Sequence, residues 1–151
     1  MKKIVITGGL GYIGTELCKI YSGYSWNDKI TVIDNRFISE RVNQIRNWNM
    51  SFIQGDILDK EIIKKYCHDA DIVHHLAGIT NVPRVKSESN NDHEEKIKIV
   101  AEEGTQNILD VISDQCKIIM PSTHVVYEGM EKVKNDIQED EKTSPVLAYG
   151  K

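Results

Sequence analysis

The chain has 151 residues, a length that suits one domain with its own core, and it is 40% hydrophobic and 28% charged, as ordinary globular proteins are. A formal net charge of −4 argues against a general attraction to nucleic acid or to an anionic membrane, and no apolar run approaches the roughly 20 residues that span a bilayer. Three widely spaced cysteines without a CxxC motif favour a reducing, cytoplasmic location and argue against a metal site.

A glycine-rich turn follows the first predicted strand. The apolar run within residues 3–7 predicts a buried parallel strand, and residues 7–14, TGGLGYIG, connect it to a predicted helix. In such a unit, free N–H groups at the helix N-terminus point at a bound pyrophosphate. Gly8 would permit the tight turn, Gly11 the approach of a phosphate, and Gly14 close packing of helix on strand. The motif predicts a dinucleotide-binding site.

An acidic residue ends the second predicted strand. Asp34 follows residues 30–33 and lies about 20 residues after the last glycine of the turn. A carboxylate at this place accepts hydrogen bonds from the adenosine ribose and repels a 2′-phosphate. Asp34 therefore favours NAD over NADP, and Arg36 weakens that preference without reversing it.

Strands and helices alternate along the whole chain. The expected strands cover residues 3–7, 30–33, 51–55, 71–76 and 117–120, and the expected helices cover residues 12–21, 39–48, 60–67 and 92–113. The first helix should bury Ile13, Leu17 and Ile20 and end near Gly23. Residues 79–91 should be irregular, residues 128–142 a surface loop, and Ser144-Pro145 the entry to a last helix. The alternation predicts an α/β fold, a Rossmann-type doubly wound parallel sheet with helices on both faces.

The fourth predicted strand carries two adjacent histidines and ends in small residues. His74 and His75 face opposite sides of a strand, so they cannot chelate one metal together, and packing or hydrogen bonding is the expected role of each. Ala77 and Gly78 follow, where the ends of the strands line the cofactor groove. Their small size would let a dinucleotide lie against the backbone.

These features resemble the extended short-chain dehydrogenase/reductase family, which includes NAD-dependent epimerases and dehydratases of nucleotide sugars such as UDP-glucose 4-epimerase. The matching motifs are TGGLGYIG at 7–14, Asp34, GDI at 55–57, HLAG at 75–78, GTQNIL at 104–109, STHVVY at 122–127, Ser144-Pro145 and YGK at 149–151. The resemblance implies a nucleotide-sugar substrate, a homodimer at full length, and NAD held by Gly8, Gly11, Tyr12, Ile13, Gly14, Asp34, Asn35, Asp56, Ile57, Leu76, Ala77 and Gly78. Asp56 and Ile57 would lie at the adenine, and Leu76 to Gly78 beside the diphosphate and nicotinamide.

The resemblance also implies a catalytic pair, Tyr149 as acid/base and Thr123 as its hydroxyl partner. A free phenol titrates near 10, so it needs a nearby cation to act as a base at neutral pH. In the family that cation is a lysine four residues after the tyrosine, a position beyond the last residue, Lys151. Two residues of a helix turn by about 200°, so the Lys151 side chain would point away from Tyr149 and cannot take the place of that lysine. We therefore expect residues 1–151 to be the NAD-binding Rossmann domain of a longer enzyme, inactive alone and without the substrate-binding part.

Departures from the family narrow the expected reaction. The 4,6-dehydratases of the family have Asp-Glu directly after the active-site threonine, and the decarboxylases also have the glutamate; here these positions are His124 and Val125. An epimerase is therefore expected, with a sugar-nucleotide reductase or a non-catalytic dinucleotide-binding module as alternatives. Ala101 replaces a usual asparagine and Glu128 a usual glycine near the site.

Overall fold

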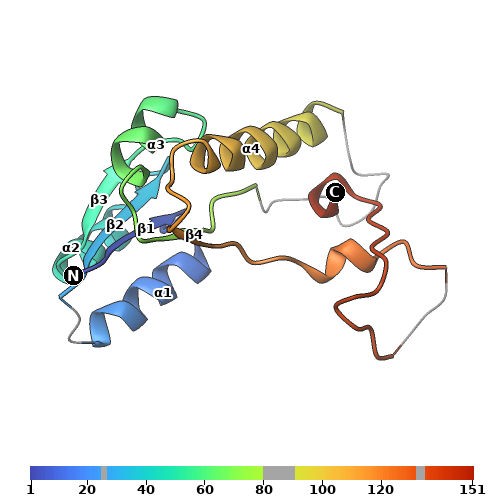
Figure 1. Ribbon diagram of the computed structural model, residues 1–151, viewed down its shortest axis with the longest axis horizontal. Coiled ribbons are helices and arrows are strands. Elements are labelled where there is room, and N and C mark those ends of the chain that lie inside the picture. The colour runs from blue at the N-terminus through green and yellow to red at the C-terminus, as the bar shows by residue number, and fades with distance from the viewer. Residues whose placement is uncertain (25–26, 80–90, 132–134) are drawn as a thin grey trace.

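A computed structural model describes residues 1–24, 27–79, 91–131 and 135–151, and it shows a parallel five-stranded sheet in the order β3-β2-β1-β4-β5 (Figure 1). The strands are β1 (Lys3–Thr7), β2 (Lys29–Asp34), β3 (Ser51–Gln54), β4 (Ile72–His75) and β5 (Lys117–Ile119). The helices are α1 (Tyr12–Gly23), α2 (Ser39–Asn47), α3 (Lys60–Cys67) and α4 (Asn91–Leu109), with 3₁₀ turns η2 (His124–Tyr127) and η3 (Ala148–Gly150). The predicted Rossmann-type fold is confirmed.

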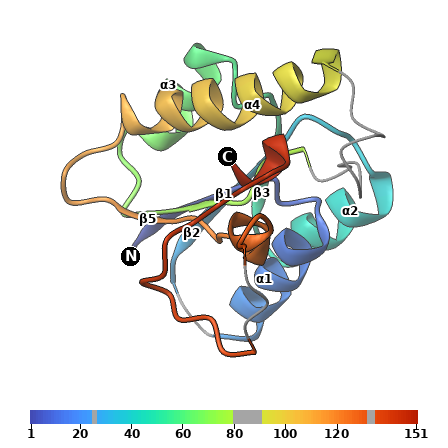
Figure 2. The same ribbon diagram turned by 90° about the vertical axis from the view of Figure 1, so that its right-hand side faces the viewer.

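Helices cover both faces of the sheet (Figure 2). Successive side chains of a strand point to opposite faces, so Ile4 and Ile6 of β1 pack beneath α1 and α2, whereas Val5 packs beneath α3 and α4. The first core consists of Ile4, Ile6, Leu10, Cys18, Ile30, Val32, Val42, Ile45 and Met50. The second consists of Val5, Ile33, Ile57, Ile63, Cys67, Ala70, Val73 and Ile108. Together, the two cores pack on both faces of the sheet and keep the carboxyl ends of β1, β2 and β4 side by side.

The buried face of α1 differs from the expected one. Ile13 and Ile20 are 65% and 55% exposed, whereas Gly14 and Cys18 face the core. Because Gly14 has no side chain, α1 lies close on the sheet and turns its Gly14–Cys18 side inward, which leaves the two isoleucines outside. The prediction that they are buried was therefore wrong.

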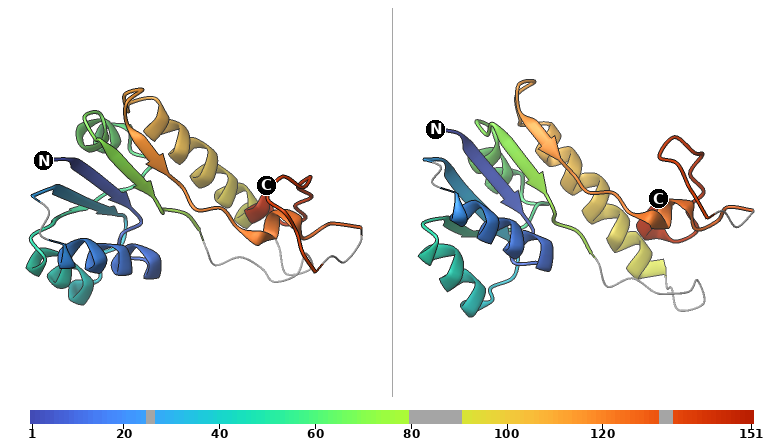
Figure 3. Two further views of the ribbon diagram at one scale, coloured as in Figure 1. Left: turned by 60° about the horizontal axis from the view of Figure 1, so that its bottom comes forward. Right: turned by 90° about the horizontal axis from the view of Figure 1, so that it is seen from below.

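The chain after β5 lies beyond the carboxyl ends of the strands. There η2 and η3 lie next to the N-terminal part of α4 (Figure 3). The last helix expected from Ser144-Pro145 is only the three-residue turn η3. Within residues 79–91, positions 80–90 lie outside the described residues, and so do 132–134 of the expected surface loop.

The sheet ends at β5, whose described partner is β4 alone. Ile119 and the following Met120 are 36% and 57% exposed. On α4, Ile97, Gly104 and Ile108 are buried, whereas Ala101 is exposed. In the described part of the chain, no helix is long and apolar enough to cross a membrane.

Candidate functional site

The glycine turn is held tightly between β1 and β4. Gly8 has φ of +68°, a conformation that favours glycine, and a Cβ there would lie 2.6 Å from the Ala77 nitrogen. A Cβ on Gly14 would lie 2.6 Å from the Gly8 oxygen and from the Gly9 Cα. Gly8 therefore lets the turn approach the end of β4, and Gly14 lets α1 begin directly against the turn. Both glycines are required by the fold before any ligand is considered.

The N-terminus of α1 opens toward solvent. Gly11 is the N-cap, and no side chain caps the helix. Tyr12 and Ile13, the first helical residues, are 85% and 65% exposed, and the first N–H groups of a helix have no partner within the helix. The helix dipole adds partial positive charge at this end, which makes it suited to an anion. The predicted phosphate-binding residues therefore lie together.

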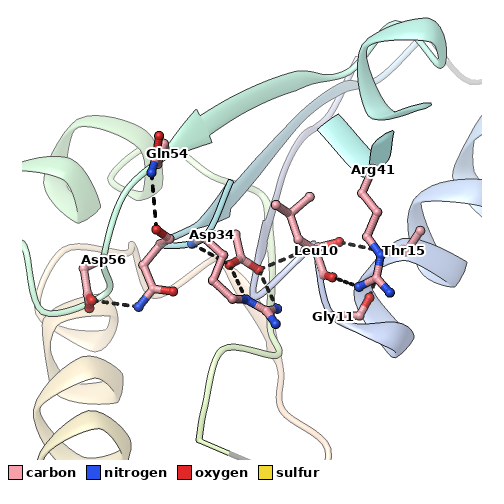
Figure 4. Close-up of polar contacts among 10 residues, drawn as sticks. Leu10, Gly11, Thr15, Asp34, Arg41, Gln54 and Asp56 are labelled. Atoms are coloured by element: carbon pink, nitrogen blue, oxygen red, sulfur yellow. Dashed lines mark hydrogen bonds and ion pairs between the residues drawn. The ribbon is translucent and has the colours of Figure 1, made fainter. Parts of the chain in front are cut away.

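Asp34 lies buried at the end of β2, directly beside this turn (Figure 4). Its Oδ2 accepts a hydrogen bond from the Leu10 N–H at 3.0 Å, and its Oδ1 accepts one from the Arg36 N–H at 3.0 Å. The Arg36 guanidinium forms an ion pair with the carboxylate, with Nε 3.2 Å from Oδ1. Arg41 of α2 donates to the Leu10 carbonyl and lies 5.2 Å over the Tyr12 ring. Arg36 thus pairs with the carboxylate that the sequence assigned to the ribose, while Arg41 holds the turn beside it.

The ends of β2 and β3 are joined by polar side chains. Asn35 Nδ2 donates to Asp56 Oδ2 at 3.0 Å, and Gln54 Nε2 donates to the Asn35 carbonyl at 3.5 Å (Figure 4). Asp56 Oδ1 accepts from the Leu58 N–H at 3.0 Å. Asn35 and Asp56, both predicted to bind the cofactor, are therefore neighbours at the carboxyl ends of β2 and β3.

Ile57 occupies the core, not the groove. Its side chain is 5% exposed and packs against Gly104 of α4, where a Cβ would lie 2.3 Å from Ile57 Cδ1. The buried Asn107 side chain donates to the Ile57 carbonyl at 3.1 Å. The backbone of Ile57, and not its side chain, is the part placed to contact a ligand, and its position at the adenine stays a prediction. Two residues of the GTQNIL motif therefore have a structural role: Gly104 leaves room for the Ile57 side chain, and Asn107 binds the Ile57 carbonyl.

Leu76, Ala77 and Gly78 follow β4 and form the wall opposite the turn. The Leu76 N–H donates to the Thr7 carbonyl at 3.1 Å, and the Ala77 N–H donates to Thr7 Oγ1 at 3.3 Å. A Cβ on Gly78 would meet nothing within 4 Å. Its small size is therefore not needed by the packing of the described residues.

The adjacent histidines of β4 make hydrogen bonds on opposite faces of the sheet, as expected. His74 Nε2 lies 2.8 Å from the Tyr21 hydroxyl of α1, whereas His75 lies between Thr7 and Thr105 of α4. Burial lowers the pKa of both rings, with Lys117 adding to the effect at His74. Both rings are therefore neutral at neutral pH.

The two predicted catalytic residues lie in the 3₁₀ turns η2 and η3. Thr123 is the N-cap of η2, where its Oγ1 accepts from the Val125 N–H at 3.3 Å, and Tyr149 of η3 is 36% exposed. The turns pack together, because a Cβ on Gly150 would lie 3.1 Å from the Val125 oxygen. In the described part of the chain, no hydrogen bond joins the two hydroxyls.

A separate hollow of about 430 Å³ lies next to η2. Its walls are His124, Val125, Tyr127, Glu128, Ile137, Gln138 and Glu139. None of the residues predicted for the cofactor or for catalysis lines it. The sequence carried no signal for this hollow, because it depends on how residues 137–139 return to η2, where the Tyr127 hydroxyl donates to the Glu139 carbonyl at 3.3 Å. Among the described residues, no cluster of His, Cys, Asp and Glu could hold a metal ion.

The fold and the turn define a Rossmann-type α/β domain, and comparisons with known proteins specify its family. The model of the 3-beta hydroxysteroid dehydrogenase/isomerase family matches residues 5–149. The chain belongs to this family, within the NAD-dependent epimerase/dehydratase group of short-chain dehydrogenase/reductase proteins, as the motifs indicated.

Several curated relatives and solved structures that the chain resembles are named as nucleotide-sugar enzymes. The chain is 30% identical over 159 residues to UDP-glucose 4-epimerase of Neisseria meningitidis serogroup C, covering 96% of this chain and 44% of the relative. It is 29% identical over 162 residues to dTDP-D-glucose 4,6-dehydratase of Dictyostelium discoideum, covering 97% and 36%. UDP-glucose 4-epimerase from Brucella ovis in complex with NAD is 26% identical, with a TM-score of 0.77, and the match covers 99% of this chain and 44% of that one. The chain thus spans less than half the length of these relatives.

Proposed function

We propose that residues 1–151 form the NAD-binding domain of an NAD-dependent nucleotide-sugar epimerase. The observation that carries the proposal is the meeting of three features at the carboxyl ends of β1, β2 and β4. These are the tight turn at Gly8, the uncapped N-terminus of α1 and the buried carboxylate of Asp34. Ligands of open α/β sheets bind at this place. The NAD-bound epimerase structures of the same fold support the choice of NAD.

Different residues of the groove would bind different parts of NAD. The N–H groups of Tyr12 and Ile13 at the start of α1 would hold the pyrophosphate, with Gly8, Gly11 and Gly14 shaping the turn so that it can approach. Asp34 and Asn35 would bind the ribose, the Asp56 carboxylate and the Ile57 backbone would bind the adenine, and Leu76, Ala77 and Gly78 would lie beside the diphosphate and the nicotinamide. The open space at Gly78 supports this arrangement, because nothing else in the described chain uses it.

The proposed chemistry is a reversible oxidation at one sugar carbon. NAD held in this groove would supply a reversible hydride acceptor, so that a hydride taken from one face of that carbon could be returned to the other face and the centre inverted. Tyr149 would take the proton of the sugar hydroxyl and later return it, with Thr123 holding the same oxygen. His124 and Val125 favour epimerisation over dehydration, since neither supplies the carboxylate pair that water elimination would use. We propose that residues 1–151 alone bind NAD with negligible turnover, because no described hydrogen bond joins Tyr149 to a cation.

We further propose that the protein acts in the cytoplasm as a homodimer. Its cysteines are unpaired, two of them buried, which suits a reducing compartment. Size-exclusion chromatography with light scattering measures the oligomeric state, and a monomer of the complete enzyme would contradict the homodimer.

Calorimetric titration of the chain with NAD and with NADP tests the proposal. NAD should bind at least about tenfold more tightly, because the buried Asp34 carboxylate repels the 2′-phosphate of NADP. Asp34→Asn keeps the shape but removes the charge, so the preference should shrink mainly through tighter binding of NADP. Failure of both dinucleotides to bind the folded chain would refute the proposal, and unchanged selectivity in Asp34→Asn would refute the role of Asp34.

A further inference from the structure

A buried chain of hydrogen bonds joins β1, β4 and α4 next to the glycine turn. Thr7, the last residue of β1, is 0% exposed and His75 is 2% exposed. Thr7 Oγ1 lies 2.8 Å from His75 Nδ1, and His75 Nε2 lies 3.0 Å from Thr105 Oγ1 of α4. The imidazole therefore bridges two hydroxyl groups that are far apart in the sequence.

The same series of hydrogen bonds extends to the wall of the proposed groove. Thr7 Oγ1 also accepts the Ala77 N–H at 3.3 Å, and the Thr7 carbonyl accepts the Leu76 N–H at 3.1 Å. The backbone of Gly8 approaches this Leu76–Ala77 peptide so closely that a Cβ would lie 2.7 Å from the Leu76 carbonyl carbon. Thr7 is thus fixed at the point where the turn and the end of β4 meet.

One tautomer of His75 is consistent with all of these hydrogen bonds. Because the Ala77 N–H occupies one lone pair of the Thr7 hydroxyl, that hydroxyl can donate its own hydrogen to His75 Nδ1. The Nε2–H of His75 then donates to Thr105 Oγ1. This assignment follows from the hydrogen-bond partners. Burial lowers the pKa of His75, which favours the neutral ring that the assignment needs.

We propose that His75 is a positioning residue of the cofactor groove: bridging Thr7 and Thr105, it holds the glycine turn against the Leu76–Ala77 peptide. The groove then has its binding shape before a dinucleotide arrives, and affinity is gained because less ordering remains to be done on binding. This inference rests on the proposed NAD binding. His75 touches neither cofactor nor substrate in this role.

His74 offers a matched control on the other face of the same strand. Its Nε2 lies 2.8 Å from the Tyr21 hydroxyl, and it is 8% exposed, so it too is a buried, hydrogen-bonded histidine. This hydroxyl belongs to α1 and lies away from Thr7 and the groove wall. Replacing His74 should therefore lower stability as replacing His75 does, without acting on the groove.

The test compares NAD affinity among four folded variants. Thr105→Val and His75→Gln should raise the Kd for NAD on the order of tenfold, the effect of losing about one net hydrogen bond of preorganisation. Thr105→Ser, which keeps the hydroxyl, and His74→Gln should stay within about twofold of the parent chain. Titrations are made at a temperature where circular dichroism shows each variant fully folded, so global unfolding does not enter the Kd.

Equal affinity in Thr105→Val and the parent would overturn the inference, and so would an equal loss in His74→Gln, since that would be a general effect of destabilisation. Amide exchange of Ala77 gives a reading that does not depend on NAD. It should be faster in Thr105→Val than in Thr105→Ser, and equal rates would contradict the inference. If the parent chain binds no NAD, the proposed function fails, and the exchange rates alone decide whether His75 holds the turn.

Discussion

Substitution of Gly8 by alanine tests whether the turn is built as described. A non-glycine residue in the left-handed region costs about 1–2 kcal/mol. The added Cβ would also lie 2.6 Å from the Ala77 nitrogen and 2.7 Å from its Cα, atoms of a backbone that cannot rotate away. Overpacking of this kind costs about 1–3 kcal/mol, so the free energy of unfolding should fall by roughly 2–5 kcal/mol.

Thermal unfolding followed by circular dichroism measures this loss. For a chain of this length, each kcal/mol lowers Tm by about 2–4 °C, so Gly8→Ala should melt roughly 4–20 °C below the parent. Gly23→Ala is the control, because Gly23 ends α1 with a negative or extended φ and its Cβ would meet nothing within 4 Å. That variant should melt at or slightly above the parent temperature. Equal melting temperatures for Gly8→Ala and Gly23→Ala would refute the described turn.

Two further predictions concern buried polar groups. Asn107→Leu should lower the free energy of unfolding by about 1–3 kcal/mol, because it leaves the Ile57 carbonyl without its donor; urea unfolding measures it, and an unchanged midpoint would contradict the contact. Acid should destabilise the fold through His74 and His75, whose folded pKa values lie below the unfolded value of about 6.5. Their contribution is present above pH 6.5 and is lost as pH falls below it, by up to about 1.4 kcal/mol per pH unit per histidine. The double variant His74→Gln/His75→Gln should show a flatter pH dependence, and an unchanged one would contradict this reasoning.

The sequence predicted the elements that local chemistry determines. The apolar run of β1, the glycines of the turn and the acidic end of β2 all have short-range signals, and the structure places them as expected. The alternation of strands and helices was enough to predict the parallel sheet, because parallel strands need crossover connections.

The errors arose where distant residues decide the outcome. Ile13 and Ile20 have helical spacing, but the approach of Gly14 to the turn decides which face of α1 is buried. Distant contacts also hold Ile57, whose side chain packs against Gly104 and whose carbonyl accepts from Asn107, about 50 residues later in the sequence; its position at the adenine stays a prediction. The last helix is a single 3₁₀ turn, and one isolated helical turn is weakly stable unless tertiary contacts extend it. The Thr7–His75–Thr105 chain spans 68 and 30 positions and had no local signal at all.

The most direct test of NAD binding at this groove is the affinity of Gly78→Ala. Among the described residues, a methyl group at Gly78 meets nothing within 4 Å, so the variant should melt like the parent chain and like Gly23→Ala. If the dinucleotide lies against the backbone of Gly78, that methyl group obstructs it, and the Kd for NAD should rise on the order of tenfold or more. Gly23→Ala should bind NAD as the parent does. A Gly78→Ala variant that binds NAD with the parent's affinity would contradict the placement of the cofactor between the glycine turn and the end of β4.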